Sequence, residues 1–214
     1  MMQKALLYAT KEKPYLLHMP KDNEEFKKGI EFSLASGKEF KEAGLDINNY
    51  KLNGKVVAEC DYEVEEIFED NFEDTRDGYV EHFYTLKSYD NFDEGQKVLL
   101  KESCLQKHEL SNYLGFENGY AIHIKSLHIF DEPKELSEFY SIEEVGGMLF
   151  TKPLTKAPQN MQRVSINNWG YASYNPDDIR VLISIRSPWM CLILNRIKDI
   201  EVRKSVLNIM KGNL

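Results

Sequence analysis

The 214-residue sequence lacks several features that mark particular classes of protein. No apolar run approaches the roughly 20 residues that a membrane-spanning helix needs. The first nine residues lack the basic start, long apolar stretch and small-residue cleavage site of a secretory signal. We therefore expect a cytoplasmic protein with no membrane partner.

Cysteine is scarce, and its spacing shows no pairing. The three cysteines, Cys60, Cys104 and Cys191, lie far apart, form no CxxC pair and have no cluster of histidines beside them. A zinc site needs cysteines or histidines at closer spacing, and a disulfide framework needs an even number of cysteines. We interpret the cysteines as buried reduced thiols, and we predict neither a metal site nor a cofactor.

Charge is distributed unevenly along the chain. The net charge is −8, but segment 179–214 holds seven basic and two acidic residues and is +5, which leaves −13 for residues 1–178. Because affinity for phosphate comes from lysine and arginine contacts, any nucleic-acid contact is expected to be local and made largely by the C-terminal segment. The alternative is that both segments are solvated surface.

The chain holds enough apolar material for one folded domain over residues 1–214. Its apolar content is 42%, and 12% of its residues are aromatic. The clearest strand covers residues 56–65, where two rows alternate strictly, as in a half-solvated antiparallel strand. The core row is predicted to be Val56, Ala58, Cys60, Tyr62 and Val64, and the outward row Val57, Glu59, Asp61, Glu63 and Glu65.

Shorter elements surround this strand. Further strands are predicted at 4–10, 119–129, 181–185 and 197–204, and short helices at 105–114, 133–140 and 187–195. In the strand 197–204, Lys198, Ile200 and Val202 are expected on one face, and Asp199, Glu201 and Arg203 on the other. Residues 20–52 and 68–94 are predicted to be insertions, 154–161 a loop, and 165–178 a connector. Dispersed strands with few short helices favour an α+β fold built on a closed or partly open barrel.

Two stretches resemble ASCH domains, which belong to the PUA-like superfamily. The stretch ISIRSPWMCLILNRIKDIEVRK is similar to the opening strand–helix–strand of that family, where a Lys-containing turn leads into a Glu-x-Arg strand. The stretch CLQKHELSNYLGFENGYAIHIKSLHIFDEPKELSEF, followed by LTKAPQNM, is similar to later elements of phage-type and bacterial members. The resemblance implies a PUA-like mixed β-barrel with short flanking helices and a phage-related origin.

The family order is rotated in this chain. In the family, the strand matching residues 4–10 directly follows the Glu-x-Arg strand, whereas here that strand lies near the C-terminus. We infer a circular permutation, in which 165–178 joins the old ends and 179–214 is equivalent to the usual N-terminal segment. The alternative is a normal domain followed by a truncated second copy. Permutation predicts that the C-terminal residues lie beside strand 4–10 and complete a closed wall around a cationic pocket.

The resemblance also implies a site. In the family, the basic helix start and the Lys, Glu and Arg of the following strand line a cleft linked to RNA or nucleotide binding. The matching positions are Arg186, Trp189, Lys198, Glu201 and Arg203. Arginine suits phosphate oxygens, and Trp189 or nearby Tyr120 is expected to stack on a base. The structural alternatives are helix packing for Trp189 and an internal ion pair for Glu201 with Arg203.

A catalytic alternative rests on the same resemblance. Some small members of the superfamily remove an acetyl group from cytidine, using a Lys, a Thr and a Glu. Lys198 matches the lysine, Glu109 is a loose match for the Glu, and Asp199 stands in place of the turn threonine. A lysine whose pKa is lowered by burial could act as base or nucleophile, but Asp199 beside it is expected to keep it protonated.

The sequence thus predicts a module that binds RNA or a modified nucleotide through a basic cleft. One alternative is an amidohydrolase acting on an acylated nucleoside such as N4-acetylcytidine, with Lys198 and Glu109 central. A second is a protein-interaction module that uses the acidic row 59–65. The sequence leaves all three open.

Overall fold

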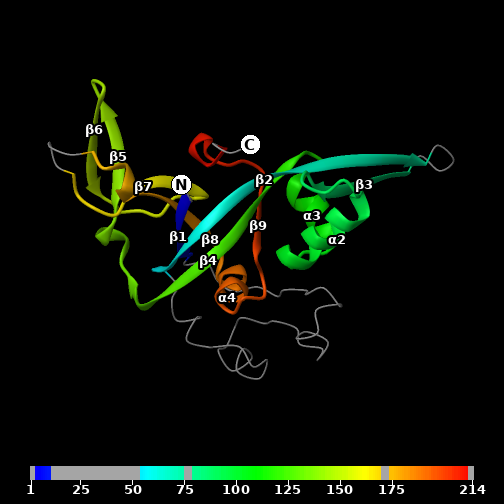
Figure 1. Cartoon of the computed structure of the whole chain (residues 1–214), viewed down its shortest axis with the longest axis horizontal. Helices are drawn as coiled ribbons and strands as arrows, with labels where there is room; N and C mark the ends of the chain where they lie inside the picture. The colour runs from blue at the N-terminus through cyan, green and yellow to red at the C-terminus, as the bar shows by residue number, and fades with distance from the viewer. Residues whose placement is uncertain (1–2, 11–53, 75–78, 170–173, 212–214) are drawn as a thin grey trace.

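The computed structural model describes residues 3–10, 54–74, 79–169 and 174–211 (Figure 1). The insertion predicted at 20–52 lies outside these residues. The strands are β1 (Gln3–Ala9), β2 (Val56–Asp74), β3 (Tyr79–Leu86), β4 (Gly119–Lys134), β5 (Tyr140–Val145), β6 (Met148–Pro153), β7 (Met161–Ser165), β8 (Ile179–Ile185) and β9 (Ile200–Arg203). The α-helices are α2 (Phe92–Ser103), α3 (Lys107–Leu114) and α4 (Ser187–Leu194), and 3-10 turns cover Leu136–Glu138, Pro176–Asp178 and Asn208–Lys211.

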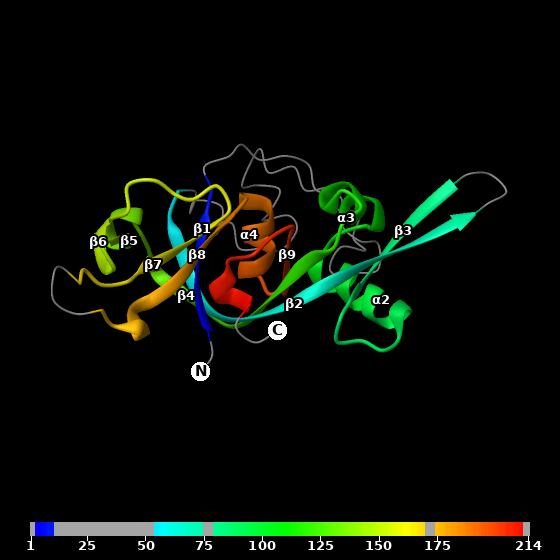
Figure 2. The same ribbon diagram turned by 90° about the horizontal axis from the view of Figure 1, so that it is seen from above.

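The nine strands of the described residues belong to one sheet. Its order is β6-β5-β7-β8-β1-β2-β4-β9, and β3 pairs with the outer part of β2. Every pairing is antiparallel except that of β1 with β8. Helices α2 and α3 lie with β3 at one end of the molecule, β5 and β6 lie at the other, and α4 lies between them (Figures 1 and 2). The predicted α+β class is confirmed.

The sheet is not closed into a barrel, so the predicted closed wall is wrong. In the described part of the chain, β6 pairs only with β5, and β9 pairs only with β4. A barrel needs continuous main-chain pairing around its circumference. Here β9 approaches β8 through a side chain, because Nη2 of Arg203 donates to the carbonyl oxygen of Ser184 at 2.7 Å.

The C-terminal segment does fold back beside the first strand, as predicted. β8 runs parallel to β1, with Ala5 opposite Val181 and Ala9 opposite Ile185. Beyond the ladder, the backbone N–H of Thr10 donates to the carbonyl oxygen of Ile185 at 3.0 Å. The strand at 181–185 and the helix beginning at Ser187 are both confirmed.

The alternation predicted for β2 holds from Ala58 onward, but not at its start. Ala58, Cys60 and Tyr62 pack in the same core cluster as α4. Val57, predicted to face outward, joins that cluster, whereas Val56 packs on the opposite face of the sheet. The register shifts between Val56 and Ala58 in the pairing with β4. A bulge of this kind adds one residue and reverses which side chain faces the core.

Two segments differ from their predicted structure. Region 68–94, predicted as a loop insertion with weak strand character near 81–86, continues β2, returns as β3 over those residues and then begins α2. Asn91 caps that helix by accepting from the Glu94 N–H at 3.2 Å. Region 133–140, predicted as a helix, holds the end of β4, a 3-10 turn and the first residue of β5. The long pairing of β2 with β3 and β4 outweighs the local helix and loop signals there.

The β5–β6 hairpin was not predicted, although its turn carries a clear signal. Gly146 and Gly147 have φ angles of 60° and 80°. Two-residue hairpin turns require positive φ at both central positions, which glycine adopts without strain. The helix 105–114, by contrast, is confirmed as α3, and Gly115 ends it in the left-handed conformation.

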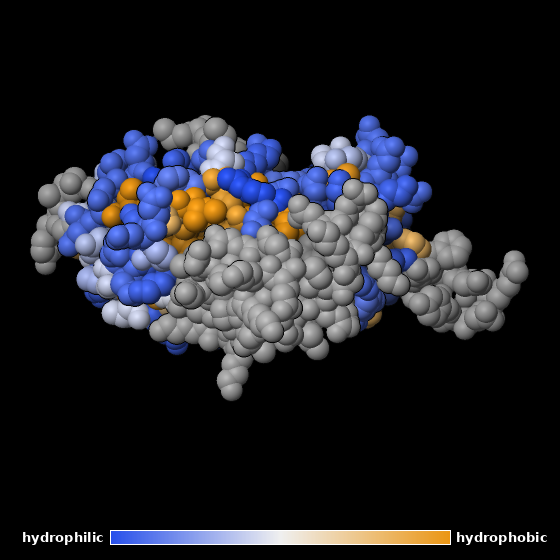
Figure 3. Space-filling view, turned by 90° about the horizontal axis from the view of Figure 1, so that it is seen from below, coloured by the Kyte–Doolittle hydropathy of each residue, from blue (hydrophilic) through white to orange (hydrophobic). Residues whose placement is uncertain are grey.

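Apolar side chains form three clusters. The first lies between α4 and the sheet, the second between α2, α3 and the strands next to them, and the third on the opposite face of β1 and β8. Viewed from below, apolar side chains gather in a central band that hydrophilic side chains border (Figure 3). The described chain therefore buries both faces of its central strands.

The predicted connector 165–178 is held to the sheet by one buried carboxylate. Asp178 accepts hydrogen bonds from Trp169 Nε1 and Asn167 Nδ2, each at 3.0 Å, and from Asn175 Nδ2 at 3.2 Å. Asp178 is 9% exposed, so these three donors replace most of its hydration. They fix the start of β8 relative to β7.

Gly95 provides a test of the packing between α2 and β3. A Cβ atom at this position would lie 2.2 Å from Thr85 Oγ1 and 2.9 Å from Tyr89 Cβ. Replacing glycine by alanine inside an exposed helix stabilises it by about 1 kcal/mol. Here we expect Gly95→Ala to lower the free energy of unfolding by about 1–3 kcal/mol, because the helix must move away from β3.

Urea denaturation measures this change. Lys97→Ala, at an exposed position of the same helix, is the matched control and should change stability little. A gain in stability for Gly95→Ala would contradict the described contact.

Candidate functional site

A pocket of about 350 Å³ opens where the start of α4, strand β9 and helix α3 meet the ends of β1 and β8. We call it the β9 pocket. Its lining residues are Thr10, Leu105, Glu109, Tyr113, Gln159, Ser184, Arg186, Trp189, Lys198, Glu201, Val202 and Arg203. Segments distant in sequence therefore meet at one site.

Lys198 forms the floor of the β9 pocket. It follows the turn after α4, where the N–H groups of Ile197 and Lys198 both donate to the carbonyl oxygen of Leu192. Its Nζ donates to the carbonyl oxygens of Ser103 at 2.7 Å and Ile200 at 2.6 Å, and lies 3.5 Å from Glu201 Oε2. The residue is only 2% exposed, so these acceptors replace water around the ammonium group.

Glu201 joins the two buried cations of the pocket. Its Oε1 lies 2.9 Å from Arg203 Nη2, while its Oε2 faces Lys198. Arg203 also donates to Asn160 Oδ1 at 2.8 Å and to the Ser184 carbonyl oxygen at 2.7 Å. The ion pair predicted as the structural alternative for Glu201 and Arg203 is thus present.

Opposing effects act on the protonation of Lys198. Burial lowers its pKa below the usual lysine value, and the nearby carboxylate of Glu201 raises it. The atoms around Nζ are all acceptors, which only the protonated form satisfies fully. Asp199, expected to hold Lys198 protonated, is exposed and is not among the groups that shift this pKa. Glu201 has that role.

Trp189 is partly buried and packs against two of the core clusters. The Nζ atom of Lys198 lies 5.0 Å from the centroid of its ring, within reach of a cation–π interaction. The packing interpretation of Trp189 therefore holds for part of its surface. The part that lines the β9 pocket is where a planar ligand would meet it.

The mouth of the pocket carries the exposed groups. Arg186 is exposed, and Tyr113 is 40% exposed. Lys204 places its Nζ 6.0 Å from the Tyr113 ring centroid. Glu109 is half-buried, and its Oε2 accepts from the Gln106 N–H at 2.8 Å in the capping box of α3.

Six of the seven predicted site residues line this one pocket: Glu109, Arg186, Trp189, Lys198, Glu201 and Arg203. Tyr120 does not line it, although it lies opposite Arg203 in the β4–β9 pairing. Lys198 also shares the Glu201 side of β9, rather than the Ile200 side predicted for it.

The pocket, predicted to be cationic, carries a small formal excess of positive charge. Three cations line it with two carboxylates, Glu109 and Glu201. Outside the pocket, Arg180 of the basic segment is paired with Glu59. Glu59 and Glu201 therefore offset part of the positive charge counted in segment 179–214.

Several lining residues were not predicted. Tyr113 lies four positions after Glu109, so one face of α3 presents both. Thr10 and Ser184 reach the site through the β1–β8 register. The helical spacing could have predicted Tyr113. No sequence pattern indicates the parallel register of two strands that lie near opposite ends of the chain.

The acidic row 59–65 is largely paired with neighbouring strands. Glu59 contacts Lys4 and Arg180, Glu63 pairs with Lys125, and Glu65 Oε2 lies 2.9 Å from His123 Nε2. These contacts reduce the negative charge available to a basic partner protein, so they weaken the protein-interaction alternative.

The cysteines with described side chains match their predicted state. Cys60 and Cys104 are free and buried. Burial raises the pKa of Cys60 to about 12 and that of Cys104 to about 11. Both are thiols at neutral pH and therefore poor nucleophiles.

Comparison of the chain with protein-family models, curated proteins and solved structures gives no match. In the described ranges, no helix is both long and apolar enough to span a membrane.

The buried cluster at the β9 pocket predicts unequal effects for two glutamates. Glu201→Ala leaves Lys198 and Arg203 next to each other without their carboxylate, so we expect a loss of about 3–5 kcal/mol in the free energy of unfolding. Glu63→Ala removes the exposed partner of Lys125 and should cost little. Denaturant titration of both variants measures the difference. Equal, small losses would show that the Glu201 cluster contributes no more than a surface ion pair.

Proposed function

We propose that this protein binds a nucleotide, either free or as part of single-stranded RNA, in the β9 pocket. The observation that carries the proposal is that Arg186, Trp189, Lys198, Glu201 and Arg203 line one pocket. These are the five positions that the resemblance to ASCH domains selected. We propose accordingly that the chain is a circularly permuted PUA-like module whose sheet stays open.

The size and composition of the pocket support a nucleotide-sized ligand. A volume of about 350 Å³ lies within the range of small-molecule sites, which bind one ligand with a few placed polar groups. Glu109 and Glu201 offer carboxylate acceptors suited to the amino groups of a base. Trp189 and Tyr113 offer aromatic surface for stacking.

The positions of the cations support different contacts for the phosphate and the base of the ligand. Arg203 and Lys198 are already bonded to Asn160, Ser184, Ser103 and Ile200, so they are fixed donors inside the pocket. Arg186 and Lys204 are exposed beside Tyr113. A phosphate would therefore contact the mouth, while the base enters between Trp189 and the buried cluster.

Intrinsic fluorescence provides a direct test. The chain has two tryptophans, so Trp169→Phe leaves Trp189 as the reporter of the pocket. We expect ribonucleoside monophosphates and short single-stranded RNA to quench it saturably. Arg186→Ala should weaken binding roughly tenfold or more, because one charge-assisted contact is worth about 1.5–3 kcal/mol, and should lower the salt dependence by about one phosphate contact.

Lys152→Ala is the control for Arg186→Ala. Lys152 is an exposed cation on β6 and should leave affinity unchanged. Absence of saturable quenching with every nucleotide and RNA would disprove the proposal. If Arg186→Ala binds with the same affinity as the parent protein, Arg186 does not contact the ligand.

A second candidate function is hydrolysis of an acylated nucleoside, and one observation favours it. Lys198 and Glu109, the two residues matched to the amidohydrolases, line the same pocket. Because acceptors surround Nζ, Lys198 would act here as a proton donor to the amide oxygen rather than as a nucleophile. Its 3.5 Å contact with Glu201 is the longest of its polar contacts and the one that a substrate oxygen could replace. Glu109 would activate the attacking water.

Release of acetate from N4-acetylcytidine tests this candidate. We expect Glu109→Gln to reduce turnover at least a hundredfold, the usual range for loss of a general base, and Lys198→Met to abolish it. Circular dichroism must show that both variants are folded. No acetate release by the parent protein, with nucleotide binding intact, would leave binding as the function.

A further inference from the structure

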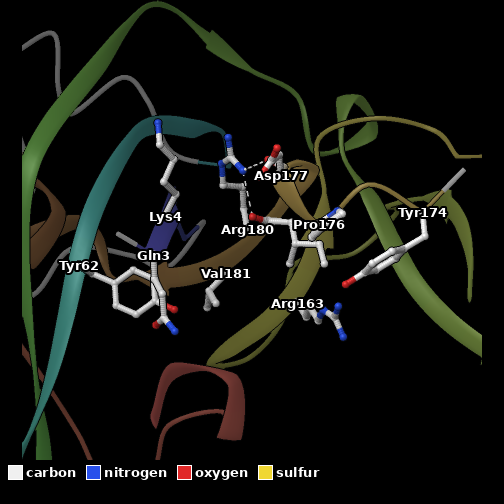
Figure 4. A pocket seen from close by; sticks show the side chains of 10 residues that line it. Gln3, Lys4, Tyr62, Arg163, Tyr174, Pro176, Asp177, Arg180 and Val181 are labelled. Atoms are coloured by element: carbon white, nitrogen blue, oxygen red, sulfur yellow. Dashed lines mark hydrogen bonds between the residues drawn. The ribbon is translucent and has the colours of Figure 1, made fainter. Parts of the chain in front are cut away.

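A second pocket, of about 570 Å³, lies at the opposite end of β1 and β8 from the β9 pocket. We call it the Arg163 pocket. Its lining residues are Gln3, Lys4, Tyr62, Arg163, Tyr174, Pro176, Asp177, Ile179, Arg180 and Val181 (Figure 4). None of these residues lines the β9 pocket, so the two sites are separate.

The cations of the Arg163 pocket differ in how they are compensated. Arg180 pairs with Glu59 and donates from Nη1 to the carbonyl oxygen of Asp177 at 2.6 Å. Lys4 lies 3.6 Å from the same Glu59. These two side chains therefore share a carboxylate from the fold itself.

Arg163 has no such partner among the described residues. It lies on β7 opposite Val181 and is half-buried. Its Nε is buried and has no hydrogen-bond partner among the described residues, and no described carboxylate forms an ion pair with it. A buried arginine donor left unpaired costs free energy. The terminal N–H groups of the guanidinium, which no described residue engages, remain to donate to a ligand.

The neighbouring side chains suit an organic ligand rather than a bare ion. Tyr174 is 50% exposed, and its ring packs edge-on against Trp169 with the centroids 5.2 Å apart. Its hydroxyl and the Arg163 guanidinium point toward the same part of the pocket (Figure 4). Tyr62, Val181 and Pro176 supply apolar surface nearby.

We propose that the Arg163 pocket binds a small organic anion whose carboxylate or phosphate group is held by the guanidinium of Arg163. The planar fork of arginine matches both groups. The apolar and aromatic lining would contact the organic part of the ligand. This site is independent of the nucleotide binding proposed for the β9 pocket.

Trp169 makes the site observable on its own, because it packs on Tyr174 and lies outside the β9 pocket. In Trp189→Phe protein, Trp169 is the remaining tryptophan. We expect phenyl phosphate or phenylacetate to change its emission saturably, beyond the effect of potassium chloride at equal ionic strength. The tighter of the two identifies the preferred head group.

The variants then assign the binding to Arg163. Arg163→Met should weaken binding at least tenfold, Arg163→Lys should weaken it less, and the control Lys152→Met should not change it. A response no larger than that of chloride, or unchanged affinity in Arg163→Met, overturns the proposal. If Arg163→Met does not fold, Arg163→Lys and Tyr174→Phe decide: parent affinity in both overturns the proposal, and weaker binding in Arg163→Lys supports it.

Discussion

The parallel pairing of β1 with β8 determines where both pockets lie. It joins the two ends of the chain in one register, from Ala5 opposite Val181 to Ala9 opposite Ile185. At one end of this ladder Thr10 lies beside the β9 pocket, and at the other Lys4 lies beside the Arg163 pocket. At about 3.3 Å per residue, the five steps from Val181 to Arg186 span about 17 Å. A register shift of one residue in this pairing would move the side chains of a strand to the opposite face of the sheet and destroy both sites.

The two pockets compensate buried positive charge to different degrees. In the β9 pocket, Glu201 lies between Lys198 and Arg203, and main-chain carbonyl oxygens accept the remaining Lys198 protons. Glu201 offsets one of these two positive charges, and Nε of Arg203 is buried without a hydrogen-bond partner among the described residues. Arg163 is left with a buried Nε that lacks an acceptor among the described residues. A partly compensated cluster suits recognition by shape and hydrogen bonding, whereas a guanidinium with no described carboxylate beside it suits capture of an anion.

Local sequence patterns predicted those elements that depend on residues close together in the sequence. The β2 alternation from Ala58, the end of α3 at Gly115 and the start of α4 at Ser187 all follow from local residue patterns. The sequence did not predict the bulge at Val57 or the open edge at β9, because both depend on pairing between distant strands. The pocket-lining residues of segment 179–214 were predicted through resemblance. The contacts of Glu201 with both Lys198 and Arg203 were not, since a count of charges says nothing about which carboxylate lies beside Lys198.

The remaining charge limits the size of ligand that the β9 pocket can favour. The whole chain carries −8, and Lys198 and Arg203 are already engaged with Glu201. Arg186 is the exposed cation among the described lining residues, and Lys204 lies outside that lining but near the ring of Tyr113. Affinity for long nucleic acids grows with the number of phosphates that lysine and arginine contact. Two such contacts on an acidic protein add little beyond the first nucleotides, so the pocket interior, rather than the phosphate backbone, would have to supply most of the selectivity.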